Sequence, residues 1–257
     1  MWLDNLINVI MKKQLFYFLA LALLTVSCQF NETLTLNEDG SGRISISMDM
    51  SEMMAFSGEL SDSAKVEKMD TLIRMKDVLE DKKDSIAQLP AKQQAKLKKL
   101  ENFNFHTVMD SEKQEMFFNL YANFKNVNEA NDLMSAFESS GDFIPSAGPG
   151  GGDIYSDPDS GGMMAVNFSY ENGKFVRDAF ITDKEKHRVQ MDSIKNAEAF
   201  MSSMKYRIKY TFPRRIKTVS VDNARFSLDG KTVEFEVPFI DYFKDPDVLD
   251  LEVELEN

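Results

Sequence analysis

The side chains that could carry chemistry in this chain are few and lie far apart in the sequence. There is one cysteine, Cys28, and there are two histidines, His106 and His187. Neither histidine stands in an H-x-x-x-H pair or beside the cysteine, so the spacing of a zinc site is absent. His106 falls on the polar side of an alternating segment, and His187 lies in a charged run. We therefore interpret neither histidine as catalytic, and no G-x-S-x-G motif supplies a serine nucleophile instead.

A stretch rich in glycine, serine, proline and aspartate covers residues 139–162. Its glycine-rich residues 148–152 lack the Lys-Ser/Thr pair of a phosphate-binding loop. Asp153, Asp157 and Asp159 could gather a calcium ion, but their spacing does not match an EF-hand, and a solvated acidic loop is the better interpretation. Because the stretch is long and has no periodicity, it predicts a surface loop or lid. We expect no bound metal, no cofactor and no enzymatic activity.

The amino terminus has the three-part layout of a secretory signal. A lysine pair at 12–13 is followed by an uncharged apolar run at 15–26 and then by Cys28. The run has about 12 residues, whereas a helix needs about 20 to cross the hydrocarbon core of a bilayer. We interpret residues 1–27 as a signal peptide, in which residues 1–10 lie upstream of the true start.

Residues 24–28, LTVSC, resemble a lipobox, the processing signal of bacterial lipoproteins. In such signals the cysteine thiol accepts a diacylglyceryl group, and the chain is cleaved just before it. The small Ser27 fits this pattern, although Thr25 stands where leucine is usual. The resemblance implies that Cys28 is lipidated, and several acyl chains at about 0.8 kcal/mol per buried CH₂ give stable anchoring. The alternative is an ordinary cleaved signal, or a short uncleaved anchor, with a chance cysteine.

The residues after the cysteine bear on location. Aspartate directly after it would resemble an inner-membrane retention signal, whereas this chain has Gln29. No acidic cluster follows the cysteine at once, which argues against export to the cell surface. The sequence therefore predicts anchoring at the periplasmic face of the outer membrane.

Composition excludes one class of partner. The 257 residues are 43% hydrophobic and 28% charged, which is ordinary for a fold that buries a core. The formal net charge is −12, and removing residues 1–27, with two lysines and one aspartate, leaves −13. That field repels phosphate backbones, so we expect no nucleic-acid partner. Phenylalanine and methionine are abundant, which suits either a packed core or an adaptable apolar cavity.

Alternation of apolar and polar residues predicts a series of strands. Hairpin turns are indicated by Gly40 and by Asn172-Gly173, since these residues tolerate a positive φ. The residues at 216–221 break the alternation once, as a β-bulge would. The predicted strands are 33–36, 42–50, 103–109, 114–124, 164–170, 174–180, 206–212, 226–228, 233–237 and 249–255.

Helical spacing of apolar residues appears in three places. Residues 51–100 form an amphipathic helical insert, within which Pro90 starts a further helix. We expect this insert to cover a sheet face, with contact to a partner or membrane as the alternative. Asn126 and Glu129 are spaced as a capping box, and another helix ends near Met204.

The order of these elements indicates the fold class. Hairpins with helices inserted between them, rather than alternating βα units, predict an α+β fold with a twisted, mainly antiparallel sheet. We predict one such domain over residues 28–257.

Two passages together resemble the LppM-like lipoprotein domain family. The first runs from Cys28 through the D-G-x-G turn at 39–42 and the strand after it. The second comprises residues 210–216 (YTFPRRI) and 228–235 (LDGKTVEF). Family members open with a strand, a D-G-x-G turn and a strand after the lipidated cysteine. They later carry a strand ending in F-P with a basic and an aliphatic residue, and then a G-x-T-V-x-aromatic strand.

This chain departs from that pattern at two positions. Arg214 stands where glycine is common after F-P, and Phe235 stands where tryptophan is common. The resemblance implies an α/β envelope domain with a suspected lipid-binding role, and it assigns no ligand-contacting residue here.

Two functions follow as expectations. The first is a non-catalytic, membrane-anchored lipoprotein that binds a lipid or another apolar envelope component, with residues 139–162 as a lid. A solid interior without a cavity would argue against it. The alternative is a structural or assembly lipoprotein that contacts other envelope proteins through residues 51–100. An enzyme would need convergent polar groups with shifted pKa values in a pocket, which the sequence does not indicate.

Overall fold

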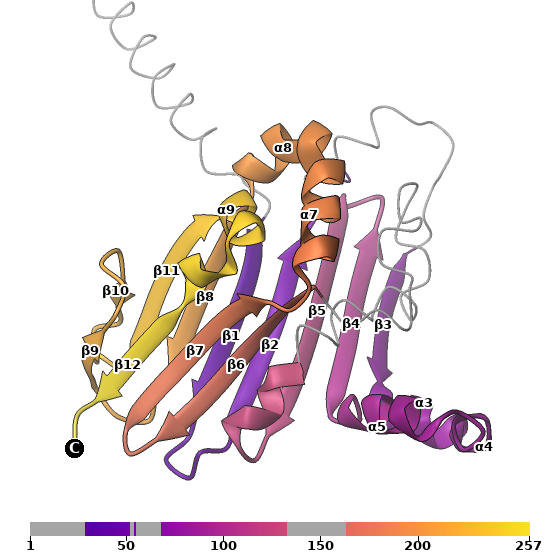
Figure 1. Cartoon of the computed structure of the whole chain (residues 1–257), viewed down its shortest axis with the longest axis horizontal. Coiled ribbons are helices and arrows are strands. Elements are labelled where there is room, and N and C mark those ends of the chain that lie inside the picture. The colour runs from indigo at the N-terminus through magenta and orange to yellow at the C-terminus, as the bar shows by residue number, and fades with distance from the viewer. Residues whose placement is uncertain (1–28, 52–53, 55–67, 133–162) are drawn as a thin grey trace, which may run out of the picture.

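The computed structural model describes residues 29–51, 54, 68–132 and 163–257 (Figure 1). The predicted signal peptide, Cys28 and the predicted loop at 139–162 lie outside these residues, as does part of the predicted helical insert. The described chain is α+β and its sheets are mainly antiparallel, which confirms the predicted fold class.

The larger sheet has eight strands in the order β10-β11-β8-β1-β2-β5-β4-β3. Within it, β1 and β8 run parallel, and the other neighbouring pairs run antiparallel. The strands are β1 (Gln29–Leu36), β2 (Gly42–Asp49), β3 (Met69–Arg74), β4 (Phe103–Asp110), β5 (Glu115–Phe124), β8 (Lys205–Thr211), β10 (Arg225–Phe226) and β11 (Thr232–Pro238).

The smaller sheet has four antiparallel strands in the order β6-β7-β12-β9. It lies across the β8, β1 and β2 part of the larger sheet (Figure 1). Its strands are β6 (Met164–Glu171), β7 (Lys174–Ile181), β9 (Ile216–Val219) and β12 (Leu251–Leu255). The register of β12 against β9 shifts near Glu254, so the break in alternation that predicted a bulge corresponds to a real irregularity between these strands.

Helices gather at the two ends of the larger sheet (Figure 1). At one end lie α3 (Met75–Asp81), α4 (Lys83–Ile86) and α5 (Ala91–Lys99). At the other end lie α7 (Lys184–Ser193), α8 (Glu198–Ser203) and α9 (Phe239–Lys244). Short 3₁₀ turns complete the described elements: η2 (Val127–Asp132), η4 (Ile194–Ala197) and η5 (Pro246–Leu249).

The predicted hairpins are confirmed, and their turns show why. Gly40 and Gly173 have φ values of 80° and 76°, and Asn172 also has a positive φ. Gly42 is required for a steric reason, because a Cβ there would lie 2.1 Å from the Thr35 carbonyl oxygen and 2.6 Å from Cζ of Phe124. The glycines therefore fix the first hairpin by conformation at one position and by space at another.

The prediction of helix over residues 69–74 was wrong, because this segment is strand β3. Met69, Thr71 and Ile73 are half-buried while Asp70, Leu72 and Arg74 are exposed, so its burial alternates with a period of two. Short apolar runs fit either period, and pairing with β4 decides in favour of the strand. Helix follows only from Met75 onward, and α5 begins after Pro90 as predicted.

The helix predicted to end near Met204 is confirmed, because α8 ends at Ser203, whereas the segment after Asn126 is not an α-helix. The segment after Asn126 is the 3₁₀ turn η2, in which the Asn126 side chain accepts from the backbone N–H of Asn128 and the Glu129 carboxylate accepts from that of Lys125. α7 was not predicted, because it is highly charged and buries none of its residues. Asp183 caps its start by accepting from two backbone N–H groups.

The space between the two sheets is filled by side chains. At one end of this space, the rings of Phe30 on β1 and Tyr206 on β8 contact those of Phe239 and Tyr242 on α9, with centroids 4.6 to 6.3 Å apart. Farther along, Phe175 meets the rings of Tyr210 and Phe212 edge-on. The abundant aromatic residues therefore build a packed core here, and the sheets enclose it as the main apolar cluster.

Strand directions place Gln29 and α3 at opposite ends of the larger sheet. Gln29 pairs with Asp49, and the register continues through β5 and β4 to the first residues of β3. The same register places Arg74, the last residue of β3, level with Thr33 of β1, and Met75 begins α3 just beyond it. β3 is also four strands across the sheet from β1, roughly 19 Å at about 4.8 Å per strand, so the α3–α5 helices lie far from the start of β1 (Figure 1).

Candidate functional site

The predicted lipidation site, Cys28, lies outside the described residues but directly precedes β1 in the chain. Gln29, the next residue, is already paired with Lys205 of β8 and Asp49 of β2. Consecutive Cα atoms are about 3.8 Å apart, so any group on Cys28 would be attached almost directly to the start of β1, a central strand of the larger sheet. No described helix has the length and apolar character needed to span a bilayer.

The structure separates the two histidines and gives each a local partner. His106 Nε2 of β4 lies 2.8 Å from Oδ1 of Asp70 on the neighbouring strand β3. His187 Nε2 of α7 lies 2.7 Å from the carbonyl oxygen of Phe243 in α9. Within the described ranges no group of three His, Cys, Asp or Glu side chains is placed to hold a metal ion. Asp153, Asp157 and Asp159 lie outside those ranges.

The most unusual polar cluster lies between the sheets, and the sequence reasoning missed it. Glu32 of β1 receives two hydrogen bonds from the guanidinium of Arg177 on β7, with donor–acceptor distances of 3.2 and 3.0 Å. The hydroxyl groups of Tyr206 and Tyr210 on β8 also donate to the Glu32 carboxylate. Arg177 completes its bonding by donating to the Leu249 carbonyl at 3.1 Å. We call these four side chains the inter-sheet clasp.

All four clasp side chains are fully buried, with exposures of 2% or less. Burial by itself would raise the pKa of Glu32, but the charge of Arg177 and the hydrogen bonds from Arg177, Tyr206 and Tyr210 hold that pKa below its ordinary value. Burial and the negative charge of Glu32 raise the pKa of both tyrosines well above normal. The clasp therefore holds one carboxylate and one guanidinium, both charged, with neutral tyrosines.

The clasp has the shifted pKa values typical of active sites but not their access. Each of its polar groups is bonded within the cluster or to backbone, and its members are enclosed by the packed rings between the sheets. A substrate would have to displace that packing, so we interpret the clasp as a structural link between the sheets. A sequence signal existed: Glu32 shares the inward parity of Phe30 and Leu34, and Arg177 shares that of Phe175 and Ala179.

The cavities of interest lie at the α3–α5 end. The larger one, which we call the helical groove, has a volume of about 630 Å³ and lies between α3, α4 and α5. Leu79, Ile86 and Leu97 line it and are half-buried, while the charged residues that line it are exposed. These charged residues are Lys76, Asp77, Glu80, Lys83, Lys98 and Glu101.

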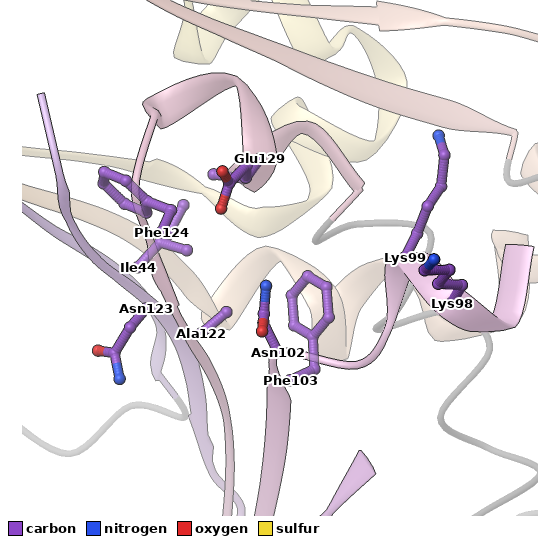
Figure 2. Close-up of a pocket in the computed structure, with 10 residues that line it drawn as sticks. Ile44, Lys98, Lys99, Asn102, Phe103, Ala122, Asn123, Phe124 and Glu129 are labelled. Carbon is purple, nitrogen blue, oxygen red and sulfur yellow. The ribbon is translucent and has the colours of Figure 1, made fainter. Parts of the chain in front are cut away.

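A smaller cavity of about 180 Å³, which we call the α5 pocket, lies beside the end of α5. Figure 2 shows the side chains that line it. Its apolar wall consists of buried residues from β2, β4, β5 and η2, and its polar residues are Lys98, Lys99, Asn102, Asn123 and Glu129. Lys98 lines both cavities, so the end of α5 separates the pocket from the groove.

Comparison with known proteins adds little to this geometry. No protein-family model and no curated protein matches the chain. Among solved structures, the chain is similar to the folded domain of LppM from Mycobacterium tuberculosis, determined by NMR, with a TM-score of 0.39, 8% sequence identity and coverage of 90% of each chain. LppM is the protein after which the family suggested by the motifs is named. A likeness of this size does not establish a shared fold, so the proposals below depend on this chain alone.

Proposed function

We propose that this chain is a non-catalytic lipoprotein of the cell envelope, anchored through lipid on Cys28, which binds an apolar envelope component in the helical groove. The proposed location is the periplasmic face of the outer membrane, for which Gln29 and the lipobox-like residues 24–28 are the support. The observation that carries the binding role is a groove with aliphatic side chains on a surface where charge otherwise dominates.

The groove has suitable dimensions and chemistry for such a role. Its volume of about 630 Å³ lies within the range of about 300–1,000 Å³ that is usual for ligand sites. Leu79, Ile86 and Leu97 come from α3, α4 and α5, so three helices present apolar groups to one opening. Covering this partly exposed apolar surface with a ligand would lower the free energy of the complex.

The groove replaces the site that we expected inside the fold. A solid interior was the observation expected to argue against lipid binding, and in the part of the chain that the structure describes aromatic side chains and the inter-sheet clasp do fill the space between the sheets. A ligand in that space would have to displace Tyr206, Phe175 or Arg177, all fully buried. The packed interior therefore argues against a ligand between the sheets, and the proposal places the ligand in the outer groove instead.

The proposal also fits a role in assembly, which was the alternative function. All the residues that line the groove except Glu101 belong to residues 51–100, the segment predicted to contact other envelope proteins. It lies at the end of the larger sheet that is opposite to Gln29, and so away from the proposed anchor (Figure 1). An occupant that approaches from the periplasm would reach it without passing the anchored end.

An apolar fluorescent probe tests the groove directly. We expect the unlipidated Cys28→Ser chain from residue 28 onward to bind N-phenyl-1-naphthylamine. Leu79→Asp should weaken binding by roughly tenfold, because a carboxylate in the apolar wall must be desolvated. Val189→Asp is the matched control, since Val189 is an exposed apolar residue on α7, outside the groove. Equal binding by wild type and Leu79→Asp, or no binding by wild type, would contradict the proposal.

A further inference from the structure

One face of the larger sheet carries an uncharged polar surface. Glu32 and the other inward residues of β1 point toward the smaller sheet, so the residues between them point to the opposite, outward face. The strand register aligns outward side chains of β1, β2, β5 and β4 in two adjacent rows across the sheet. We call seven of these side chains the outer strip: Thr33, Ser45, Tyr121 and Asn104 in one row, and Asn31, Ser47 and Asn119 in the other.

The outer strip contains no charged residue, although 28% of the chain is charged. All of its side chains are half-buried, as is usual in the middle of an open sheet. Charged residues border it, since Lys209 of β8 lies beside Thr33 and Arg74 of β3 lies beside Asn104. The strip itself therefore lacks both the cations that bind a nucleic acid or an acidic lipid and the apolar surface that binds a lipid tail.

The outer strip has hydrogen-bonding capacity that the chain does not use. Ser45 donates to Oδ1 of Asn119 at 3.0 Å, which leaves the amide N–H groups of Asn119 available. In the part of the chain that the structure describes, the side chains of Asn31, Thr33 and Ser47 make no hydrogen bond. A carboxamide offers two donors and one acceptor, and a hydroxyl offers both functions. The strip therefore presents donors and acceptors together, without charge.

Tyr121 adds a hydroxyl to the strip rather than a free ring face. The guanidinium carbon of Arg43 lies 4.0 Å from the centroid of the Tyr121 ring, so a cation already covers one face of that ring. A ligand on the strip would therefore be held by hydrogen bonds. Each such bond replaces a bond to water, so its net gain is small and binding should be weak but selective.

The spacing of the rows suits an extended polymer. Neighbouring strands lie about 4.8 Å apart, so a row across four strands spans roughly 14 Å and presents a polar group at intervals close to the length of one sugar ring. Glycan chains combine dense hydroxyl groups with an absence of charge, and N-acetylated sugars add amide groups. This is the chemistry that carboxamide and hydroxyl side chains complement.

From these observations we infer that the outer strip binds a neutral glycan chain of N-acetylated sugars. The carboxamides of Asn31 and Asn119 bind acetamido groups, and the hydroxyls of Thr33, Ser47 and Tyr121 bind sugar hydroxyls. The strip is separate from the helical groove, so the inference goes beyond the proposed function and does not depend on it.

Calorimetric titration with chitohexaose tests the inference. The full chain is purified from membranes in a polyoxyethylene detergent, which carries no sugar. We expect a Kd of about 0.1–1 mM, and roughly tenfold weaker binding of cellohexaose, which lacks the acetamido groups. Asn31→Ala with Ser47→Ala should weaken chitohexaose binding roughly tenfold, because two hydrogen-bonding groups are lost.

The matched control is Asn167→Ala with Ser169→Ala, which removes the same side chains from exposed positions on β6, outside the strip, and should leave the affinity unchanged. Urea unfolding shows whether each variant folds. Thr33→Val, which removes one hydroxyl at nearly constant volume, is a second variant and should weaken binding about threefold. No binding of chitohexaose, equal affinity for cellohexaose, or an equal loss in the β6 control would each overturn the inference.

Discussion

At the residue scale, Glu32 shows how a charged side chain can belong to a core. It occupies an inward position of β1, between Phe30 and Leu34, and its four hydrogen bonds come from β7 and β8. Removing two charges from water costs several kcal/mol per ion, so the clasp adds less stability than its bond count suggests. The clasp places Arg177 of β7 opposite Glu32 of β1 and so fixes the relative position in which the two sheets pack.

Breaking the clasp on one side should be costly. We expect Glu32→Gln to lower the free energy of unfolding by about 3–5 kcal/mol, because the Arg177 charge would stay buried without a counter-ion. The double variant Glu32→Leu with Arg177→Met should recover much of that loss, since it removes both charges. Urea unfolding of the three proteins measures this. A Glu32→Gln protein as stable as wild type would show that the pair does not act as described.

The clasp also predicts that the free energy of unfolding depends on pH. Because the pKa of Glu32 is lower in the folded chain than its ordinary value of 4.5, its contribution is complete above pH 4.5 and is lost as the pH falls through the folded-state pKa. We therefore expect the stability gap between wild type and Glu32→Gln to narrow between about pH 6 and about pH 3.5. Urea unfolding at these pH values tests it, and a gap that widens on acidification would reverse the predicted sign.

At the element scale, local signals located most of the strands. Gly40, Asn172 and Gly173 have the positive φ values that their turns require, and these residue types made the hairpins predictable. The β3 segment was wrongly predicted to be helical, because its methionine, leucine and isoleucine fit helical spacing as well as alternation. α7 was not predicted, because a helix without a buried residue has no apolar stripe in its sequence.

The first hairpin gives the sharpest prediction for an element. Gly42→Ala should lower the free energy of unfolding by about 1–3 kcal/mol or more, because the new Cβ would overlap the Thr35 carbonyl and the Phe124 ring. Gly40→Ala is the control: a Cβ there meets nothing within 4 Å, so only the strain of its positive φ remains, about 1–2 kcal/mol. Thermal unfolding compares them, and a larger loss in Gly40→Ala would count against the steric argument.

At the scale of the whole molecule, the arrangement depends on contacts that local patterns do not encode. The smaller sheet joins β6 and β7 to β12 and β9, which are separated from them by long stretches of chain. Alternation indicates that each segment is a strand, but it does not say that the strands form two sheets, or that Glu32 meets Arg177. The helical groove likewise needs three helices from residues 75–99 to meet at one opening, which periodicity alone does not specify.

The direction of the strands links the proposed anchor to the proposed binding site. Gln29, the residue after Cys28, begins β1 at the end of the larger sheet where α8 and α9 lie, and the groove lies at the opposite end (Figure 1). A lipid on Cys28 would therefore place the groove at the end of the domain that faces away from the membrane.

Mass spectrometry of the amino-terminal peptide, from protein purified out of native membranes, tests the anchor most directly. The account predicts that residues 1–27 are absent and that Cys28 is the first residue, carrying a diacylglyceryl group on its thiol and an acyl chain on its amine. A peptide with an unmodified Cys28 that is still joined to the preceding residues would contradict it.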